Sequence, residues 1–143
     1  GQAVRMRRWD MAPLLLGHRD LALLVCAWLW LPLGLGLVGA ALMGFQGVAI
    51  ATAVHALTMG LMGSMILAVM ARGWMRREPG RLLVGRPTAV AFGLLQLAAA
   101  FRLGVGDTGP AAAVWLCAWA LAAAQCVVSL FQPVPHPVLS ARR

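Results

Sequence analysis

The sequence predicts an all-α membrane protein built from four transmembrane helices. Of its 143 residues, 62% are hydrophobic and only 11% are charged. The mean hydropathy of +0.83 is far above that of a soluble domain. Four apolar runs approach or exceed the length of about 20 residues that a hydrocarbon core requires. The runs are continuous, and this excludes the alternating pattern of membrane barrel strands.

The first predicted helix spans about residues 21–43 and follows an N-terminal segment, 1–20. Pro32 lies inside it and cannot donate a backbone hydrogen bond, so we expect a kink that leaves the carbonyl of Trp28 without its helical partner. The second helix spans about 48–71, without a formal charge. Small residues at fourfold spacing predict close antiparallel packing of these two helices; they are Gly36, Ala40 and Gly44 in the first and Thr52, Ala56, Gly60 and Ser64 in the second.

The third helix is expected at about 88–104 and the fourth at about 111–131, which closes a transmembrane domain over 21–131. A Pro-rich tail, 132–143, follows. Arg102 lies within the third helix and is the exception, whereas the other eleven arginines lie before the first helix, in the 72–86 connection and at the chain end. By the positive-inside rule these parts are cytoplasmic, so the predicted topology is N-in/C-in.

The net charge of +8 comes from twelve arginines against four acidic residues. A basic protein can bind nucleic acid, but these arginines stand in short connections between apolar runs, where they act as topology signals. The sequence therefore indicates membrane lipid as the surrounding partner and excludes nucleic acid. It also contains no paired intramembrane carboxylates, Ser/His/Asp set or phosphate-binding loop, which excludes hydrolytic and phosphoryl-transfer chemistry and leaves any other enzymatic activity open.

His55 interrupts the second apolar run about seven residues, or roughly 11 Å, from its outer end. An imidazole in lipid is costly unless something engages it, so it marks a candidate functional site. On an α-helix, residues three, four and seven apart share a face. This spacing groups His55 with Thr58, Met59 and Met62.

Imidazole nitrogen and thioether sulfur both bind haem iron and copper. His55 and Met59 lie one turn apart, so they could bind one copper ion more easily than opposite faces of one porphyrin; haem would need a second helix. The residues leave alternatives open. His55 could instead donate a hydrogen bond to a neighbouring helix or relay protons, and Met59 and Met62 could simply fill the core.

The run His55–Arg72 (HALTMGLMGSMILAVMAR), followed by Gly85-Arg86-Pro87, resembles the NnrS family of bacterial inner-membrane proteins. Trp30–Gly36 (WLPLGLG) is similar to the family's preceding helix, and the resemblance covers about residues 13–132. The family comprises multi-pass proteins with more spans than this chain. The resemblance therefore implies a fragment corresponding to a C-terminal portion, embedded in a larger polytopic bundle in the bacterial inner membrane.

The resemblance also implies haem b and/or copper as cofactors and a role in resistance to nitric oxide and nitrosative stress. His55 matches the histidine of the shared motif and becomes a candidate haem or copper ligand, while Met65 and Arg72 match later motif positions. Val25 stands where family members often carry another histidine. The site within this chain is therefore expected to be incomplete and to need the remaining spans or a partner subunit.

Two other functions remain open from the sequence. The chain could be a structural or transporter-like four-helix module without a cofactor, in which His55 only hydrogen-bonds. It could also be a small membrane oxidoreductase whose oligomer supplies the second haem ligand by symmetry. Arg72 likewise has a simpler interpretation as a cytoplasmic anchor.

Overall fold

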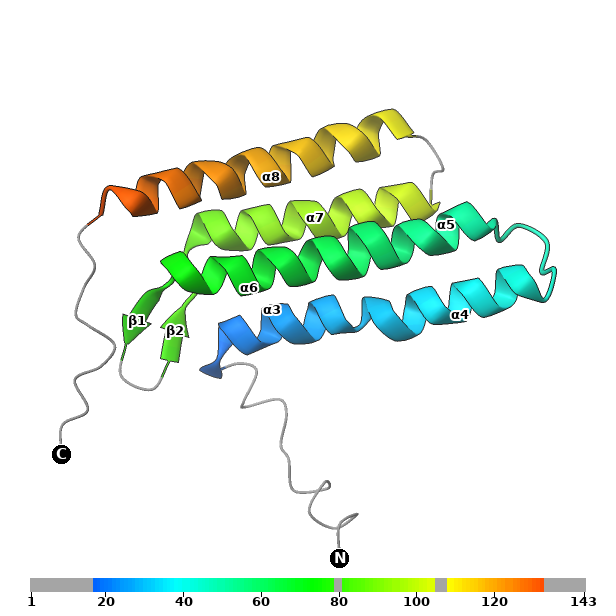
Figure 1. Cartoon of the computed structure of the whole chain (residues 1–143), viewed down its shortest axis with the longest axis horizontal. Helices are drawn as coiled ribbons and strands as arrows, with labels where there is room; N and C mark the ends of the chain where they lie inside the picture. The colour runs from blue at the N-terminus through cyan, green and yellow to red at the C-terminus, as the bar shows by residue number, and fades with distance from the viewer. Residues whose placement is uncertain (1–16, 79–80, 105–107, 133–143) are drawn as a thin grey trace, which may run out of the picture.

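A computed structural model describes residues 17–78, 81–104 and 108–132 of the chain. The predicted N-terminal segment before Gly17 and the Pro-rich tail after Gln132 lie outside these residues. The described part consists of helices lying side by side, with a small hairpin at one end (Figure 1). In chain order the elements are α3 (Arg19–Trp28), α4 (Trp30–Leu42), α5 (Ile50–His55), the π-helix η1 (Ala56–Gly63), α6 (Ser64–Trp74), β1 (Arg76–Glu78), β2 (Arg81–Leu83), α7 (Arg86–Gly104) and α8 (Thr108–Leu130).

Four helical segments are long and apolar enough to cross a membrane, so the predicted all-α fold with four such helices is confirmed. They cover Arg19–Leu42, Ile50–Trp74, Arg86–Gly104 and Thr108–Leu130. Large apolar side chains remain exposed along them, and Leu42 and Leu130 are 77% and 76% exposed. Water would penalise this surface, whereas lipid would not. The N-in/C-in orientation stays a prediction.

The first membrane-length segment is interrupted where Pro32 predicts a kink. α3 ends at Trp28 and α4 begins at Trp30, so that the break falls at Leu29, within one turn before the proline. Proline cannot donate to the carbonyl four residues earlier, which here belongs to Trp28. The expected disturbance of this helix is therefore present.

The connection from α4 to α5 begins with a glycine-dependent cap. The Gly44 N–H donates to the Ala41 carbonyl and the Phe45 N–H to the Ala40 carbonyl. This pair of bonds is the Schellman motif, which needs a left-handed residue after the helix. Gly44 supplies it with φ of 75°, and Gly47 turns the chain again with φ of 90°. The chain thereby reverses, and the next segment runs antiparallel to α4.

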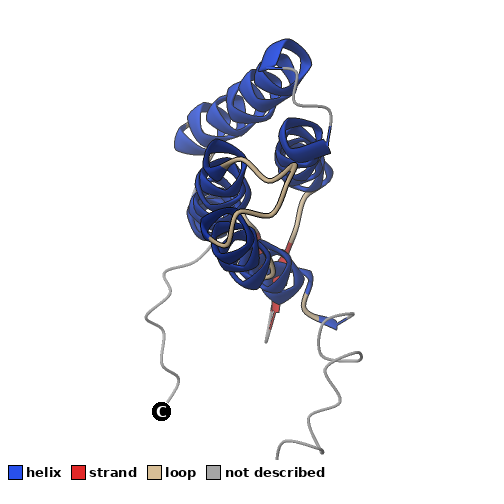
Figure 2. Ribbon diagram, turned by 90° about the vertical axis from the view of Figure 1, so that its right-hand side faces the viewer, coloured by secondary structure: helices blue, strands red, loops and turns tan. Residues whose placement is uncertain are grey.

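The α5–η1–α6 segment occupies the middle of the bundle. α3 and α4 contact it on one side, and α7 and α8 lie on the other, as the end-on view also shows (Figure 2). The buried core is rich in alanine, with Leu67 and Leu95 as its largest fully buried apolar side chains. Small side chains let helix backbones approach closely where lipid provides no hydrophobic drive.

The arginine-rich connection predicted over 72–86 contains a short β-hairpin. β1 and β2 pair antiparallel, with Arg76 opposite Leu83 and Arg77 opposite Leu82. Figure 1 places this hairpin at the end of the bundle where α6 and α8 end and α7 begins. The arginines of this connection, Arg72, Arg76, Arg77, Arg81 and Arg86, thus lie at one end of the described bundle. We call it the arginine-rich end.

Candidate functional site

His55 is the last residue of α5, and its side chain is half-buried. Its Nδ1 atom lies 2.6 Å from the carbonyl oxygen of Ala51, one turn earlier. A carbonyl oxygen can only accept, so Nδ1 must carry the proton and donate it. In the neutral imidazole the lone pair is then on Nε2. The helix backbone therefore fixes the tautomer that leaves Nε2 able to bind a metal.

The segment after His55 is a π-helix, and this corrects the α-helical geometry assumed from the sequence. η1 runs from Ala56 to Gly63 with bonds between residues five apart in place of four. Two α-helical turns bring position i+7 back to the face of position i, but the wider turns of a π-helix do not. The grouping of Met62 with His55 by sevenfold spacing thus loses its basis. Met62 is 55% exposed.

The other motif residues differ in their surroundings. Thr58 Oγ1 donates to the Val54 carbonyl at 2.9 Å, so this hydroxyl is engaged by the preceding turn. Met59 is half-buried in η1. Met65 lies in α6 and packs against the hydrophobic core. Of the predicted thioethers, Met59 therefore keeps the proximity of about one turn to His55, while Met65 serves packing.

Two glycines bring α4 into close contact with η1. A Cβ atom added to Gly60 would overlap the indole ring of Trp30, and one added to Gly34 would overlap the end of the Leu57 side chain. The first two membrane-length segments are therefore in close contact, as predicted. The glycine of α4 at this contact is Gly34, which the predicted fourfold spacing does not include. Gly36 and Gly44, which the fourfold spacing favoured, have open space around them.

A polar chain crosses three helices directly beside η1. Trp30 Nε1 donates to Gln96 Oε1 at 2.5 Å, and Gln96 Nε2 donates to Ser64 Oγ at 2.6 Å. Ser64 is fully buried and is the first residue after η1. In an apolar interior each of these groups would be costly without its partner. The chain thus links α4, α7 and the end of the π-helix.

We expect Gln96→Leu to lower the free energy of unfolding by about 1–3 kcal/mol, because it strands the Trp30 indole N–H and the Ser64 hydroxyl. Gln46→Leu is the matched control, since Gln46 is exposed in the α4–α5 connection. Denaturant titration in detergent micelles measures both. Equal stability of the two variants would show that the polar chain contributes nothing.

An ion pair joins α6 to α3 at the arginine-rich end. Arg72 Nη2 in α6 lies 3.3 Å from Asp20 Oδ2 in α3, and the two side chains are 41% and 6% exposed, respectively. Asp20 Oδ1 is buried and accepts no hydrogen bond within the described residues. Arg72, which the sequence analysis interpreted as a motif residue or an anchor, therefore neutralises a buried carboxylate.

A second polar chain lies nearer the arginine-rich end. Trp74 Nε1 donates to Thr88 Oγ1 at 3.2 Å, Thr88 Oγ1 donates to Gln125 Oε1 at 2.7 Å, and Gln125 Nε2 donates to the Leu121 carbonyl at 3.3 Å. This chain ties the end of α6 to the start of α7 and to α8. Three of its members, Trp74, Leu121 and Gln125, also line an open groove.

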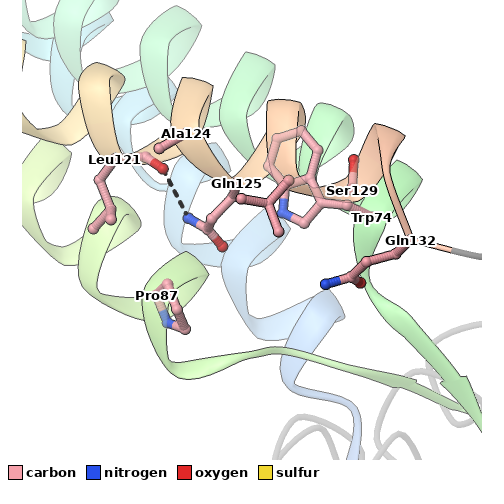
Figure 3. Close-up of a pocket in the computed structure, with 8 residues that line it drawn as sticks. Trp74, Pro87, Leu121, Ala124, Gln125, Ser129 and Gln132 are labelled. Atoms are coloured by element: carbon pink, nitrogen blue, oxygen red, sulfur yellow. Dashed lines mark hydrogen bonds between the residues drawn. The ribbon is translucent and has the colours of Figure 1, made fainter.

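The groove has a volume of about 380 Å³. Figure 3 shows it between the end of α6, the start of α7 and the second half of α8. Its apolar lining consists of Pro87, Leu121, Ala124 and Val128. Its polar lining consists of Trp74, Gln125, Ser129 and Gln132. The groove contains none of the predicted site residues.

The described residues contain no group of three or more His, Cys, Asp or Glu side chains placed to hold a metal ion. A ligand set drawn from these types alone is therefore not assembled in this part of the chain. His55 could contribute one ligand, with Met59 as the nearest candidate for a second. No pattern in the sequence indicates the π-helix, the Gln96 chain or the groove, although opposite charges at one predicted end of the bundle could have suggested the Asp20–Arg72 pair.

Comparison with known proteins identifies one family. The model of the NnrS protein family matches residues 1–134 of the 143-residue chain. No curated protein and no solved structure gives a significant match. The family match extends over all four membrane-length helices, including the His55 motif and the Gly85-Arg86-Pro87 connection. The chain therefore belongs to the NnrS family.

Proposed function

We propose that this membrane protein of the NnrS family binds haem b or copper through His55 and contributes to resistance to nitric oxide and nitrosative stress in the bacterial inner membrane. The observation that carries the proposal is the 2.6 Å contact between His55 Nδ1 and the Ala51 carbonyl. Histidines that bind metals commonly donate their second ring N–H to a carbonyl or carboxylate, which orients the ring and raises the basicity of the ligating nitrogen.

The surroundings of His55 suit a residue that supplies one metal ligand, with further ligands coming from outside the four described helices. Nε2 is a competent ligand for both haem iron and copper. The ring is half-buried in a segment whose outer side chains face away from the bundle, such as Val54 at 46% exposure. A second ligand can therefore approach from beyond the four described helices. The remaining spans of a longer chain or a partner subunit would provide it.

Met59 could act as a ligand beside His55 in a copper site but not in a haem site. A thioether one turn from an imidazole can join it on one Cu(I) ion, for which soft sulfur ligands are favourable. The same two residues cannot occupy opposite faces of a porphyrin, so a haem iron bound to His55 takes its second axial ligand from another helix. Met59 therefore distinguishes a copper site from a haem site.

The proposal is tested by measuring iron and copper per chain, together with the optical spectrum, in the longest native form of the protein. We expect His55→Ala to reduce the bound metal by at least about tenfold, because losing even a group that only orients a ligand lowers metal affinity by about 10- to 100-fold. Met62→Leu is the control in the same segment and retains the metal. Met59→Leu lowers copper content in a copper site and leaves a haem Soret band unchanged. Equal metal content in wild type and His55→Ala contradicts the proposal.

One observation favours a second candidate, a structural or transporter-like module without a cofactor. His55 and Thr58 both bond to carbonyls of their own helix. The segment therefore satisfies one polar atom of each side chain without any ligand. A colourless, metal-free protein whose His55→Ala variant changes only in stability supports this candidate.

A further inference from the structure

The groove at the arginine-rich end changes in character along its length. Leu121 and Ala124 line its inner part, toward the middle of α8, whereas Ser129 and Gln132 line the part where α8 ends. Figure 3 shows the Gln132 amide extending toward the space between Pro87 and Trp74. One portion of the groove is thus apolar and the other can form hydrogen bonds. An amphipathic ligand with a tail and a polar head matches this order.

Arginines stand close in sequence to two residues that line the groove. Pro87 and Trp74 line the groove, and Arg86 directly precedes the first while Arg76 follows two residues after the second. Arg76, Arg77 and Arg86 are all exposed. Among the residues whose burial is described, Asp20 is the buried acid, and it is already paired with Arg72. The charge at this mouth therefore favours an anionic head group.

The size and position of the groove suit a lipid. Its volume of about 380 Å³ lies within the range of small-molecule pockets. It lies between three helices that are long and apolar enough to cross a membrane, and a lipid would surround such helices. Basic pockets between transmembrane helices bind anionic head groups, because guanidinium groups donate paired hydrogen bonds to phosphate oxygens.

We propose that this groove is a binding site for an anionic phospholipid. One acyl chain lies against Leu121, Ala124 and Val128, and the phosphate is held at the mouth by Arg86 with the amide of Gln132. Trp74, held by its bond to Thr88, forms the wall at the level of the head group. Aromatic residues with one polar end favour that level of a membrane. The site is separate from His55 and does not depend on a metal.

The test is native mass spectrometry of the intact chain with palmitoyl-oleoyl phosphatidylglycerol and, separately, the corresponding phosphatidylcholine. Wild type is expected to retain phosphatidylglycerol more tightly. Arg86→Gln should weaken the binding of phosphatidylglycerol by about fivefold, which is the effect of one arginine near a membrane surface. The binding of phosphatidylcholine should not change. Arg19→Gln is the control, because Arg19 is exposed at the start of α3, on the opposite side of the bundle from α8.

A second pair of variants tests the cavity itself. Ala124→Trp fills the apolar portion of the groove and should weaken the binding of both lipids by more than about tenfold. Ala123→Trp is the matched control, since Ala123 is also exposed on α8 but does not line the groove. Unaltered lipid binding by Ala124→Trp, or an unaltered phosphatidylglycerol preference in Arg86→Gln, overturns the proposal. Failure of wild type to retain either lipid also overturns it and indicates that protein covers the groove. None of these outcomes changes the metal content that tests His55.

Discussion

Replacing Arg72 with methionine is expected to lower the free energy of unfolding by about 3 kcal/mol. The side chain of Asp20 is only 6% exposed, and its Oδ2 atom lies 3.3 Å from Arg72 Nη2. Methionine keeps the apolar stem of the side chain but leaves the buried carboxylate without its partner. Asp20 lies in the first turn of α3, where the helix dipole partly stabilises a negative charge. The loss should therefore fall at the lower end of the range for broken buried pairs.

Replacing Asp20 in place of Arg72 should lower the free energy of unfolding much less. Asp20→Asn leaves Arg72 unpaired, but that side chain is 41% exposed at the helix end and can reach water or lipid head groups. We expect a loss of about 1 kcal/mol for this variant. The double variant should then be more stable than Arg72→Met alone, because no buried charge remains to be neutralised.

Denaturant titration of the purified protein in detergent micelles measures these differences, with Arg76→Met as the control. Arg76 is exposed on β1, so its replacement should change stability by less than about 0.5 kcal/mol. Equal losses for Arg72→Met and Arg76→Met contradict the assignment of Arg72 to Asp20. Arg72 would in that case be only one of several arginines at this end of the bundle.

The four helices could be predicted because membrane segments obey simple constraints. Every backbone group in lipid must bond within its own segment, so length and hydropathy alone identify a helix. The break before Pro32 was predictable for a similar reason, since the missing N–H acts on its own helix. These features depend on neighbouring residues in the chain. They required no knowledge of how the helices pack.

The packing of the helices was predicted only in part. The fourfold spacing of small residues indicated contact between the first two helices, but the contact at α4 uses Gly34 against Leu57 and leaves Gly36 in open space. A helix presents several small residues, and which of them faces a neighbour depends on the rotation of both helices. The π-helix η1 changes that rotation within the second segment. Its sequence, ALTMGLMG, contains no residue type reserved for wider turns.

The candidate site could likewise be predicted only in part. His55 was recognisable because one imidazole in a long apolar run requires an explanation. Its hydrogen bond to Ala51 was not predictable, since a histidine can donate to its own helix or to a neighbour. The grouping with Met62 loses its geometric basis because it assumed α-helical turns throughout. The polar chain through Gln96 joins residues 66 and 32 positions apart, and such separations leave no periodic pattern.

Gly60 provides the second large prediction, because it is the point where α4 and the π-helix meet. A Cβ atom there overlaps the indole ring of Trp30, which is rigid and held by its bond to Gln96. We expect Gly60→Ala to lower the free energy of unfolding by about 2–3 kcal/mol, as overpacking of a core does. The overlap at Gly34 involves only the flexible end of Leu57, so Gly34→Ala should cost less.

The control for Gly60→Ala is Gly36→Ala, since Gly36 lies on α4 with no atom near the added methyl group. Alanine there should be neutral or slightly stabilising, because it favours the helix more than glycine does. A double-mutant cycle of Gly60→Ala with Trp30→Leu isolates the contact. If the indole causes the loss, the two changes together should cost at least about 1 kcal/mol less than their sum. An additive result would place the cost of Gly60→Ala in the backbone of η1, where a methyl group would then disfavour the π-helical turns directly.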